Sequence, residues 1–134
     1  MSPREENDMR DVIETDDAPA AVGAYSQGIV TDSLVVTSGQ VPLTPGGELL
    51  DDAPIEDQTE QALRNVDAVL QEAGSSLSEA IKVTVMLDDI DDYEAMNEVY
   101  GTFFEEEPPA RSAFEVGSLP LGVDVEIEAL ASRS

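Results

Sequence analysis

Apolar and polar residues alternate with two different periods along this chain. Segments rich in β-branched residues, with period-two alternation, predict three short strands, over 12–14, 26–30 and 34–39. The Thr31-Asp32-Ser33 step between the last two indicates a hairpin turn. Apolar positions that recur every three or four residues predict a helix from Ile55 to Ala73, with Pro54 in its first turn and Gly74 at its C-terminal cap.

The second half of the chain continues the succession of strands and helices. The pattern predicts a strand over 82–87, a helix that runs to about Phe104, and two final strands that begin near Arg111 and Val123. Either Asp91 or Asp92 can cap this second helix. The order β-β-β-α-β-α-β-β predicts an α+β fold, a single domain over residues 12–134 with both helices packed on one face of a mixed sheet. Residues 1–11 are charged without an apolar pattern, and we expect a mobile acidic tail there.

The last two predicted strands carry the candidate chemistry. Side chains alternate along a strand, so Arg111 and Ala113 share one face of the first. In the second, the apolar residues from Val123 to Ala131 share one face, and Glu126 and Glu128 lie on the other. If the two strands pair, a guanidinium and a carboxylate can meet beside a common pocket. Such a pair is suited to binding a small carboxylic acid and moving protons next to it.

Composition narrows the function classes. The chain has neither cysteine nor histidine, so disulfides, thiol nucleophiles and histidine or cysteine metal sites are excluded. Thirty acidic residues face six basic ones, and the net charge of −24 is spread along the whole length. That charge predicts a protein adapted to molar salt, and it argues against nucleic-acid binding. No apolar run is long enough to span a membrane, and no signal peptide precedes the domain, so we expect a cytoplasmic protein without membrane contact.

Several segments in register resemble one known family, the reactive-intermediate deaminases (RidA/YjgF). The resemblance covers 13–133 and rests on Ala18–Gly28, Thr37–Pro42, Tyr93–Tyr100, Pro109-Ala110-Arg111-Ser112, Leu119-Pro120 and Glu126-Ile127-Glu128-Ala129. It implies a chorismate-mutase-like fold and a homotrimer with sites between subunits. It also implies that no metal or organic cofactor takes part.

The activity that the resemblance implies is hydrolysis of 2-iminobutanoate and 2-iminopropanoate to 2-keto acids and ammonia. Arg111 then binds the substrate carboxylate, Glu126 directs and deprotonates the attacking water, and Tyr25 hydrogen-bonds the substrate or that water. Ser38 and Gly39 line the pocket, and Asn97 contributes an amide. Ala113 stands where the family usually has cysteine, which puts the role of a thiol at that position in doubt.

Each assignment has a structural alternative. Arg111 can be an ion-pair partner of a glutamate on the same strands, Asn97 can make a purely structural buried hydrogen bond, and Tyr25 can be an interface aromatic. Glu126 and Glu128 can form a solvated face, and the choice between them rests on the family pattern. A second function class is also open: a non-catalytic trimer that binds or senses 2-keto acids or similar carboxylates.

Overall fold

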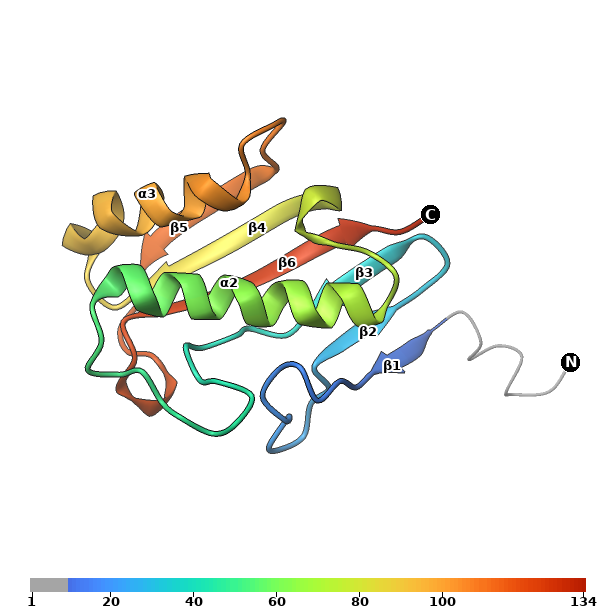
Figure 1. Cartoon of the computed structure of the whole chain (residues 1–134), viewed down its shortest axis with the longest axis horizontal. Helices are drawn as coiled ribbons and strands as arrows, with labels where there is room; N and C mark the ends of the chain where they lie inside the picture. The colour runs from blue at the N-terminus through green and yellow to red at the C-terminus, as the bar shows by residue number, and fades with distance from the viewer. Residues whose placement is uncertain (1–9) are drawn as a thin grey trace, which may run out of the picture.

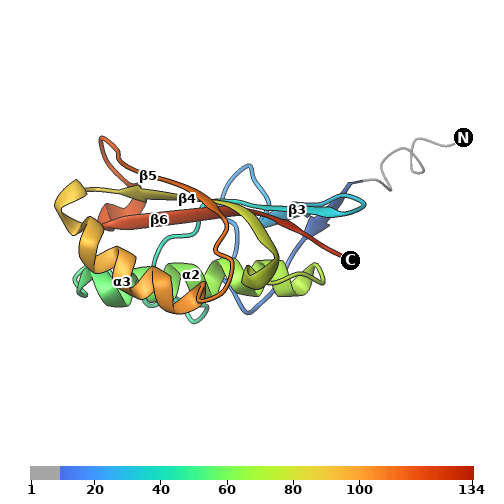
Figure 2. The same cartoon turned by 90° about the horizontal axis from the view of Figure 1, so that it is seen from above.

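A six-stranded sheet carries two helices on one face and leaves its other face open (Figure 1, Figure 2). The computed structural model describes residues 10–134. The strands are β1 (Asp11–Ile13), β2 (Gly28–Val30), β3 (Leu34–Thr37), β4 (Ala80–Leu87), β5 (Ala110–Glu115) and β6 (Val125–Ser132), and the helices are α2 (Ile55–Glu72) and α3 (Tyr93–Phe103). The predicted α+β class and element order are confirmed. The expected mobile tail lies outside the described residues except for Arg10 and Asp11, and Asp11 is the first residue of β1.

The strand order is β1-β2-β3-β6-β4-β5. Neighbouring strands are antiparallel except β4 and β5, which are parallel and are connected through α3. The hypothesis that the last two strands pair is therefore wrong, because β4 lies between β5 and β6 and bonds to both. A parallel neighbour for β5 is the natural outcome of a helix that crosses over the sheet between two strands.

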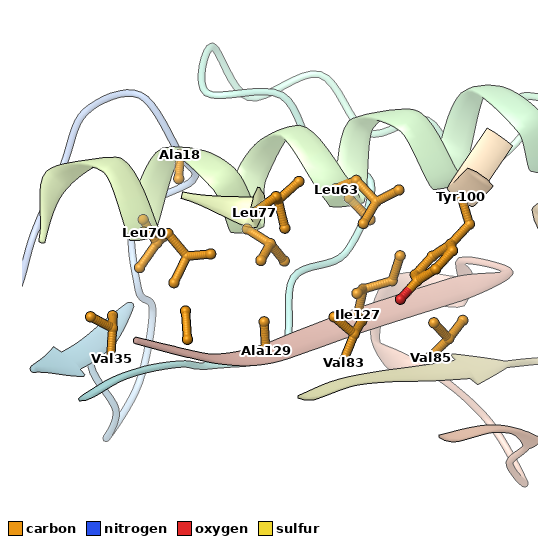
Figure 3. Close-up of a cluster of buried hydrophobic side chains, with 14 of the residues drawn as sticks. Ala18, Val35, Leu63, Leu70, Leu77, Val83, Val85, Tyr100, Ile127 and Ala129 are labelled. Carbon is orange, nitrogen blue, oxygen red and sulfur yellow. The ribbon is translucent and has the colours of Figure 1, made fainter. Parts of the chain in front are cut away.

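The core lies between the sheet and the two helices. Leu63 and Leu70 of α2 face Val83 of β4 and Ile127 of β6, and all four side chains are fully buried (Figure 3). Burying each such side chain contributes about 1.5–3 kcal/mol. The open face instead presents large apolar side chains that are partly exposed: Leu34, Val36 and Phe114.

Helix ends follow the sequence signals with one exception. Pro54 precedes α2, and Gly74 adopts a φ of +82° just beyond its end, a conformation that glycine takes without steric cost. Asp92 occupies the residue before α3, but its side chain makes no cap hydrogen bond. Asp89 caps the preceding turn instead, accepting a hydrogen bond from the Asp91 N–H at 2.9 Å.

Several strand ends differ from the prediction by one or two residues: β1 covers Asp11–Ile13 rather than 12–14, β4 begins at Ala80 rather than at residue 82, and β6 begins at Val125 rather than at Val123. Two further differences fall at the same place. β2 begins at Gly28 rather than at residue 26, and β3 ends at Thr37 rather than at residue 39. Pairing with β6 resumes at Gln40, which exchanges two backbone hydrogen bonds with Ile127 at 2.7 and 3.0 Å. Between the pairs Val36–Leu130 and Gln40–Ile127, the chain that follows β3 thus has one residue more than β6, which makes a bulge.

Candidate functional site

Glu126 projects from β6 onto the open face of the sheet and meets the bulge at Gly39. A Cβ built at Gly39 would lie 2.8 Å from the Cδ of Glu126 and would collide with its Oε2. Any side chain at position 39 would therefore displace the carboxylate from its present place. Only glycine allows the backbone and the carboxylate to approach so closely.

Glu126 and Gly39 lie in a cleft of about 720 Å³. Ser38 lines it from the bulge, and its hydroxyl donates a hydrogen bond to a backbone carbonyl two residues before β2. Tyr25 lines it from the loop between β1 and β2 and is 54% exposed. The Tyr25 hydroxyl accepts a hydrogen bond from the Val22 N–H at 3.3 Å. Four of the predicted site residues, Tyr25, Ser38, Gly39 and Glu126, are thus brought together.

Two buried amide side chains hold the loops that form the cleft walls. The Gln27 amide donates to the carbonyls of Thr15 and Pro19 at 3.0 and 2.8 Å, and its oxygen accepts from the Thr15 N–H at 2.7 Å. Asn65 of α2 donates to two carbonyls of the loop that follows the bulge, at 2.8 and 3.0 Å. The sequence pattern predicted no role for either residue here. The signal that could have found Asn65 is an amide on the apolar face of an otherwise amphipathic helix.

The Glu126 carboxyl is electrostatically unusual. Partial burial raises the pKa of Glu126, and the negative charge of Glu128 raises it further. A carboxyl with a raised pKa takes up and releases a proton closer to neutral pH, which is the property required of a general acid or base. The alternative that Glu126 belongs to a merely solvated face does not fit its contact with Gly39.

Arg111 lies on the opposite face of the sheet, next to α3. Its guanidinium donates to the Asn97 Oδ1 at 2.7 Å and to the Tyr93 hydroxyl, and it lies 4.6 Å from the centre of the Tyr100 ring. These contacts fix the plane of the guanidinium, and a contact with the face of an aromatic ring stabilises a cation. The cleft beside it has a volume of about 420 Å³ and is lined also by Pro108 and Pro109.

Within one chain, therefore, the candidate residues form two separate groups. Arg111 pairs in register with Val83, whose side chain is in the core below the helices, whereas Glu126 pairs with Met86 on the open side. The prediction that the guanidinium and the carboxylate meet beside one pocket of the same chain is wrong, because β4 separates their strands and the two side chains leave opposite faces.

Asn97 and Ala113 accompany Arg111. Asn97 is exposed rather than buried, and its hydrogen bond is made to the arginine. The expectation that Asn97 makes a buried bond within an apolar stripe is therefore wrong. Ala113 shares a face with Arg111, as predicted, and packs against the edge of the core. Neither aromatic partner of Arg111 was predicted, although Tyr93 and Tyr100 stand three or four residues on either side of Asn97.

Across residues 10–134, no group of three or more acidic side chains is arranged to hold a metal ion. No helix in the same part of the chain is both long and apolar enough to cross a membrane.

A family model described as Endoribonuclease L-PSP matches residues 15–133, almost the whole chain. This chain belongs to that family, the RidA/YjgF family. A rat protein named 2-iminobutanoate/2-iminopropanoate deaminase is 42% identical over 123 residues, which are 92% of this chain and 90% of the rat protein. A RutC family protein of Pyrococcus horikoshii is 46% identical over 125 residues, covering 93% of this chain and 99% of that protein.

Solved structures of RidA/YjgF proteins have the same fold. The crystal structure of Escherichia coli TdcF with bound serine matches with a TM-score of 0.88 and 44% identity, covering 92% of this chain and 99% of that one. Yeast Mmf1 matches with a TM-score of 0.90 and 38% identity, covering 93% and 99% of the two chains. The family and the fold that the sequence motifs predicted are confirmed.

Proposed function

We propose that this RidA-family protein hydrolyses 2-imino acids such as 2-iminobutanoate and 2-iminopropanoate to 2-keto acids and ammonia. The observation that carries the proposal is the contact between Glu126 and Gly39, which holds a carboxyl of raised pKa over a glycine backbone in a cleft. The name of the rat relative describes the same activity for that protein.

The reaction needs one proton acceptor and no cofactor. The substrate reacts in its protonated iminium form. Glu126 removes a proton from water as the oxygen bonds to the iminium carbon, and the C=N π electron pair moves onto nitrogen, which gives a neutral carbinolamine. The protonated Glu126 then gives that proton to the nitrogen of the carbinolamine. The C–N bond breaks, the hydroxyl oxygen forms the carbonyl, and the hydroxyl proton leaves with ammonia as ammonium. Tyr25 hydrogen-bonds the substrate or the water, and Ser38 supplies a hydroxyl to the pocket wall.

We also propose that Arg111 binds the substrate carboxylate and that the site is completed between two chains of a homotrimer. A planar guanidinium binds both oxygens of a carboxylate. Support for the second chain comes from the placement of Arg111 and Glu126 on opposite faces of the sheet, since one substrate molecule cannot contact both in a single chain. The partly exposed Val36 and Phe114 of the open face offer apolar surface for such assembly.

Within the family we infer that RNA is not a substrate of this chain, despite the description of the family model as an endoribonuclease. Only six of 134 residues are basic, and the net charge is −24. Binding to RNA or DNA depends on cations that neutralise several phosphates at once. An acidic surface of this strength repels the phosphate backbone instead.

The test is release of keto acid and ammonia from freshly generated 2-iminobutanoate in molar potassium chloride. Glu126→Gln keeps the shape of the side chain but cannot accept the proton, so turnover is expected to fall by about 10²–10⁴-fold while 2-ketobutyrate still binds. Glu128→Gln, a neighbour on the same face that also lines the cleft, is the matched control and should retain turnover at pH values above the pKa of Glu126. Arg111→Ala should lose both turnover and keto-acid binding, with Arg64→Ala on α2 as its control.

Wild-type hydrolysis no faster than the spontaneous reaction would overturn the deaminase. In that case retained binding of 2-ketobutyrate, abolished in Arg111→Ala, would identify the second candidate, a non-catalytic binding protein for small carboxylates. The exposed guanidinium cleft beside Asn97 is the observation that supports this alternative. Full turnover in Glu126→Gln would refute the proton-transfer role by itself.

A further inference from the structure

Leu121 has a backbone conformation that leucine rarely adopts. Its φ and ψ are 62° and 12°, in the left-handed region, which it shares among non-glycine residues 10–134 only with Glu107. Such a conformation costs about 1–3 kcal/mol and persists only where the surroundings impose it. The Leu121 side chain is also 60% exposed, so burial in the protomer does not compensate for this cost.

Residues on both sides of Leu121 constrain its backbone. Pro120 precedes it with a fixed φ, and Gly122 follows with a φ of 71°. The chain is then tied to α2, because the Asp124 N–H donates to the oxygen of the fully buried Gln58 at 2.8 Å. The Gln58 amide returns a hydrogen bond to the Asp124 carboxylate at 2.9 Å. The tight turn before β6 therefore holds the leucine in place.

Leu121 forms part of the wall of the cleft that contains Glu126. Other apolar residues line the same cleft from the loop between β1 and β2, among them Ala20 and the 82% exposed Val22. The cleft thus combines the carboxyls of Glu126 and Glu128 with apolar wall residues that come from separate loops.

We propose that Leu121 is a specificity-determining residue that contacts the side chain of the 2-imino acid and favours apolar over polar side chains. This inference rests on the proposed function. The imine carbon carries three groups: the nitrogen, the carboxylate and the side chain. Glu126 serves the nitrogen and the attacking water, and the Arg111 guanidinium binds the carboxylate. The side chain, as the remaining group, lies against the cleft wall, where an apolar contact with Leu121 stabilises it.

The experiment compares kcat/KM for 2-iminobutanoate and 2-iminopropanoate, which differ by one methylene, in the wild type and in Leu121→Gly. One methylene in an apolar site is worth about 10-fold, so the wild type should prefer 2-iminobutanoate by about that factor. In Leu121→Gly the ratio should fall toward one. Glycine adopts the left-handed conformation freely, so the melting temperature should be unchanged or higher.

Glu107→Gly is the matched control. Glu107 is the other non-glycine residue with a positive φ in the described part of the chain, and its loop does not line the Glu126 cleft. It should leave the substrate ratio unchanged. An unchanged ratio in Leu121→Gly, with active enzyme, overturns the specificity role and leaves the deaminase standing. A lower melting temperature together with an unchanged ratio would identify Leu121 as merely structural.

If the wild type shows no turnover, the deaminase fails and the same comparison is made by calorimetry with 2-ketobutyrate and pyruvate. The preference for 2-ketobutyrate should again be lost in Leu121→Gly and kept in Glu107→Gly. Equal affinities of the wild type for the two keto acids, or no binding of either, would overturn the inference.

Discussion

Replacing Gly39 with alanine tests the arrangement of the cleft more directly than removing Glu126 itself. The substitution adds one methyl group and changes no charge. That methyl would overlap the Glu126 carboxylate, with its carbon 2.8 Å from Cδ. Ordinary contacts between such carbons begin near 3.4 Å, so the carboxylate must move by roughly 1 Å or rotate away from the bulge.

The expected effects on activity and on stability are very different in size. A displacement of roughly 1 Å of a reacting group can cost about 10²-fold in rate, so kcat for 2-iminobutanoate hydrolysis should fall by about that factor. The stability cost should be small, because the atoms that must move are the end of a flexible, partly exposed side chain. Alanine also restricts the unfolded chain, which offsets about 0.4–1 kcal/mol of the strain.

The assay pairs steady-state kinetics with urea unfolding in molar potassium chloride. Gly117→Ala is the matched control. Apart from the glycine itself and its two chain neighbours, no described residue has a heavy atom within 4 Å of a Cβ built there, and its φ is not in the positive region. It should retain full activity. Gly39→Ala with wild-type kcat would refute the reasoning, because the carboxylate would then not need its position over the glycine. A loss of folding in Gly39→Ala alone would show instead that the bulge is structurally essential.

Four further predictions concern charge and burial. Burial and the charge of Glu128 raise the pKa of Glu126. In a pH–rate profile, kcat/KM should therefore rise with pH through an apparent pKa above that of an ordinary glutamate. Glu128→Gln should shift this rise to lower pH. Because the pKa of Glu126 is higher in the folded than in the unfolded chain, binding of its proton stabilises the folded state. This stabilisation is fully present below the pKa of the unfolded chain and is lost as pH rises through the pKa of the folded chain. Urea unfolding at several pH values should show this pH dependence in the wild type and not in Glu126→Gln. The Tyr100 hydroxyl is buried without a hydrogen bond to any described residue, so Tyr100→Phe should raise the free energy of unfolding by about 1 kcal/mol. Because the ring against Arg111 remains, calorimetry should show unchanged binding of keto acid by Arg111. A loss of stability would show that the hydroxyl has a hydrogen-bond partner. The net charge of −24 is screened in molar salt, so the circular-dichroism signal of the helices should weaken on dilution to low salt. Sucrose added in place of the salt should not restore the signal. Full helicity at low salt would refute adaptation to salt.

Local patterns predicted the elements well because each signal acts within a few residues. The period of apolar positions located α2, and Gly74 marked its end by the left-handed conformation it adopts. Two of the strand ends that were placed wrongly, near residues 26 and 38, have strand-like sequences. They leave the sheet because Gln27 and the bulge redirect them through contacts with distant segments, and single-segment patterns do not contain that information.

The sequence named the candidate residues, but it did not predict how they are arranged in the fold. Alternation along β6 placed Glu126 on the correct face, and the pairing of Arg111 with Asn97 was absent from the pattern because it joins a strand to a helix. The strand order decided the rest. Which strand enters between β5 and β6 depends on the crossover through α3, so consecutive strands in the sequence need not be neighbours in the sheet.

The proposed assembly makes a quantitative prediction that a single-chain site cannot satisfy. Arg111→Ala and Glu126→Gln should each be inactive as pure proteins. Unfolded together in equal amounts and refolded, the two variants should regain about one quarter of wild-type activity. In a ring, each site takes Arg111 from one subunit and Glu126 from the next. Each of these two subunits carries the intact residue with a probability of about one half, so about one quarter of the sites have both.

The control is a mixture of the same two proteins folded separately, which should stay inactive until the subunits exchange. A chain that carries both substitutions, refolded with wild type, supplies a second control, because its intact sites should likewise number about one quarter of the total. Co-refolded single variants that remain inactive, beside a double-variant mixture that keeps activity, would place both residues in one chain's site. That outcome would contradict the separation of Arg111 and Glu126 by β4, and the shared site between subunits would have to be abandoned.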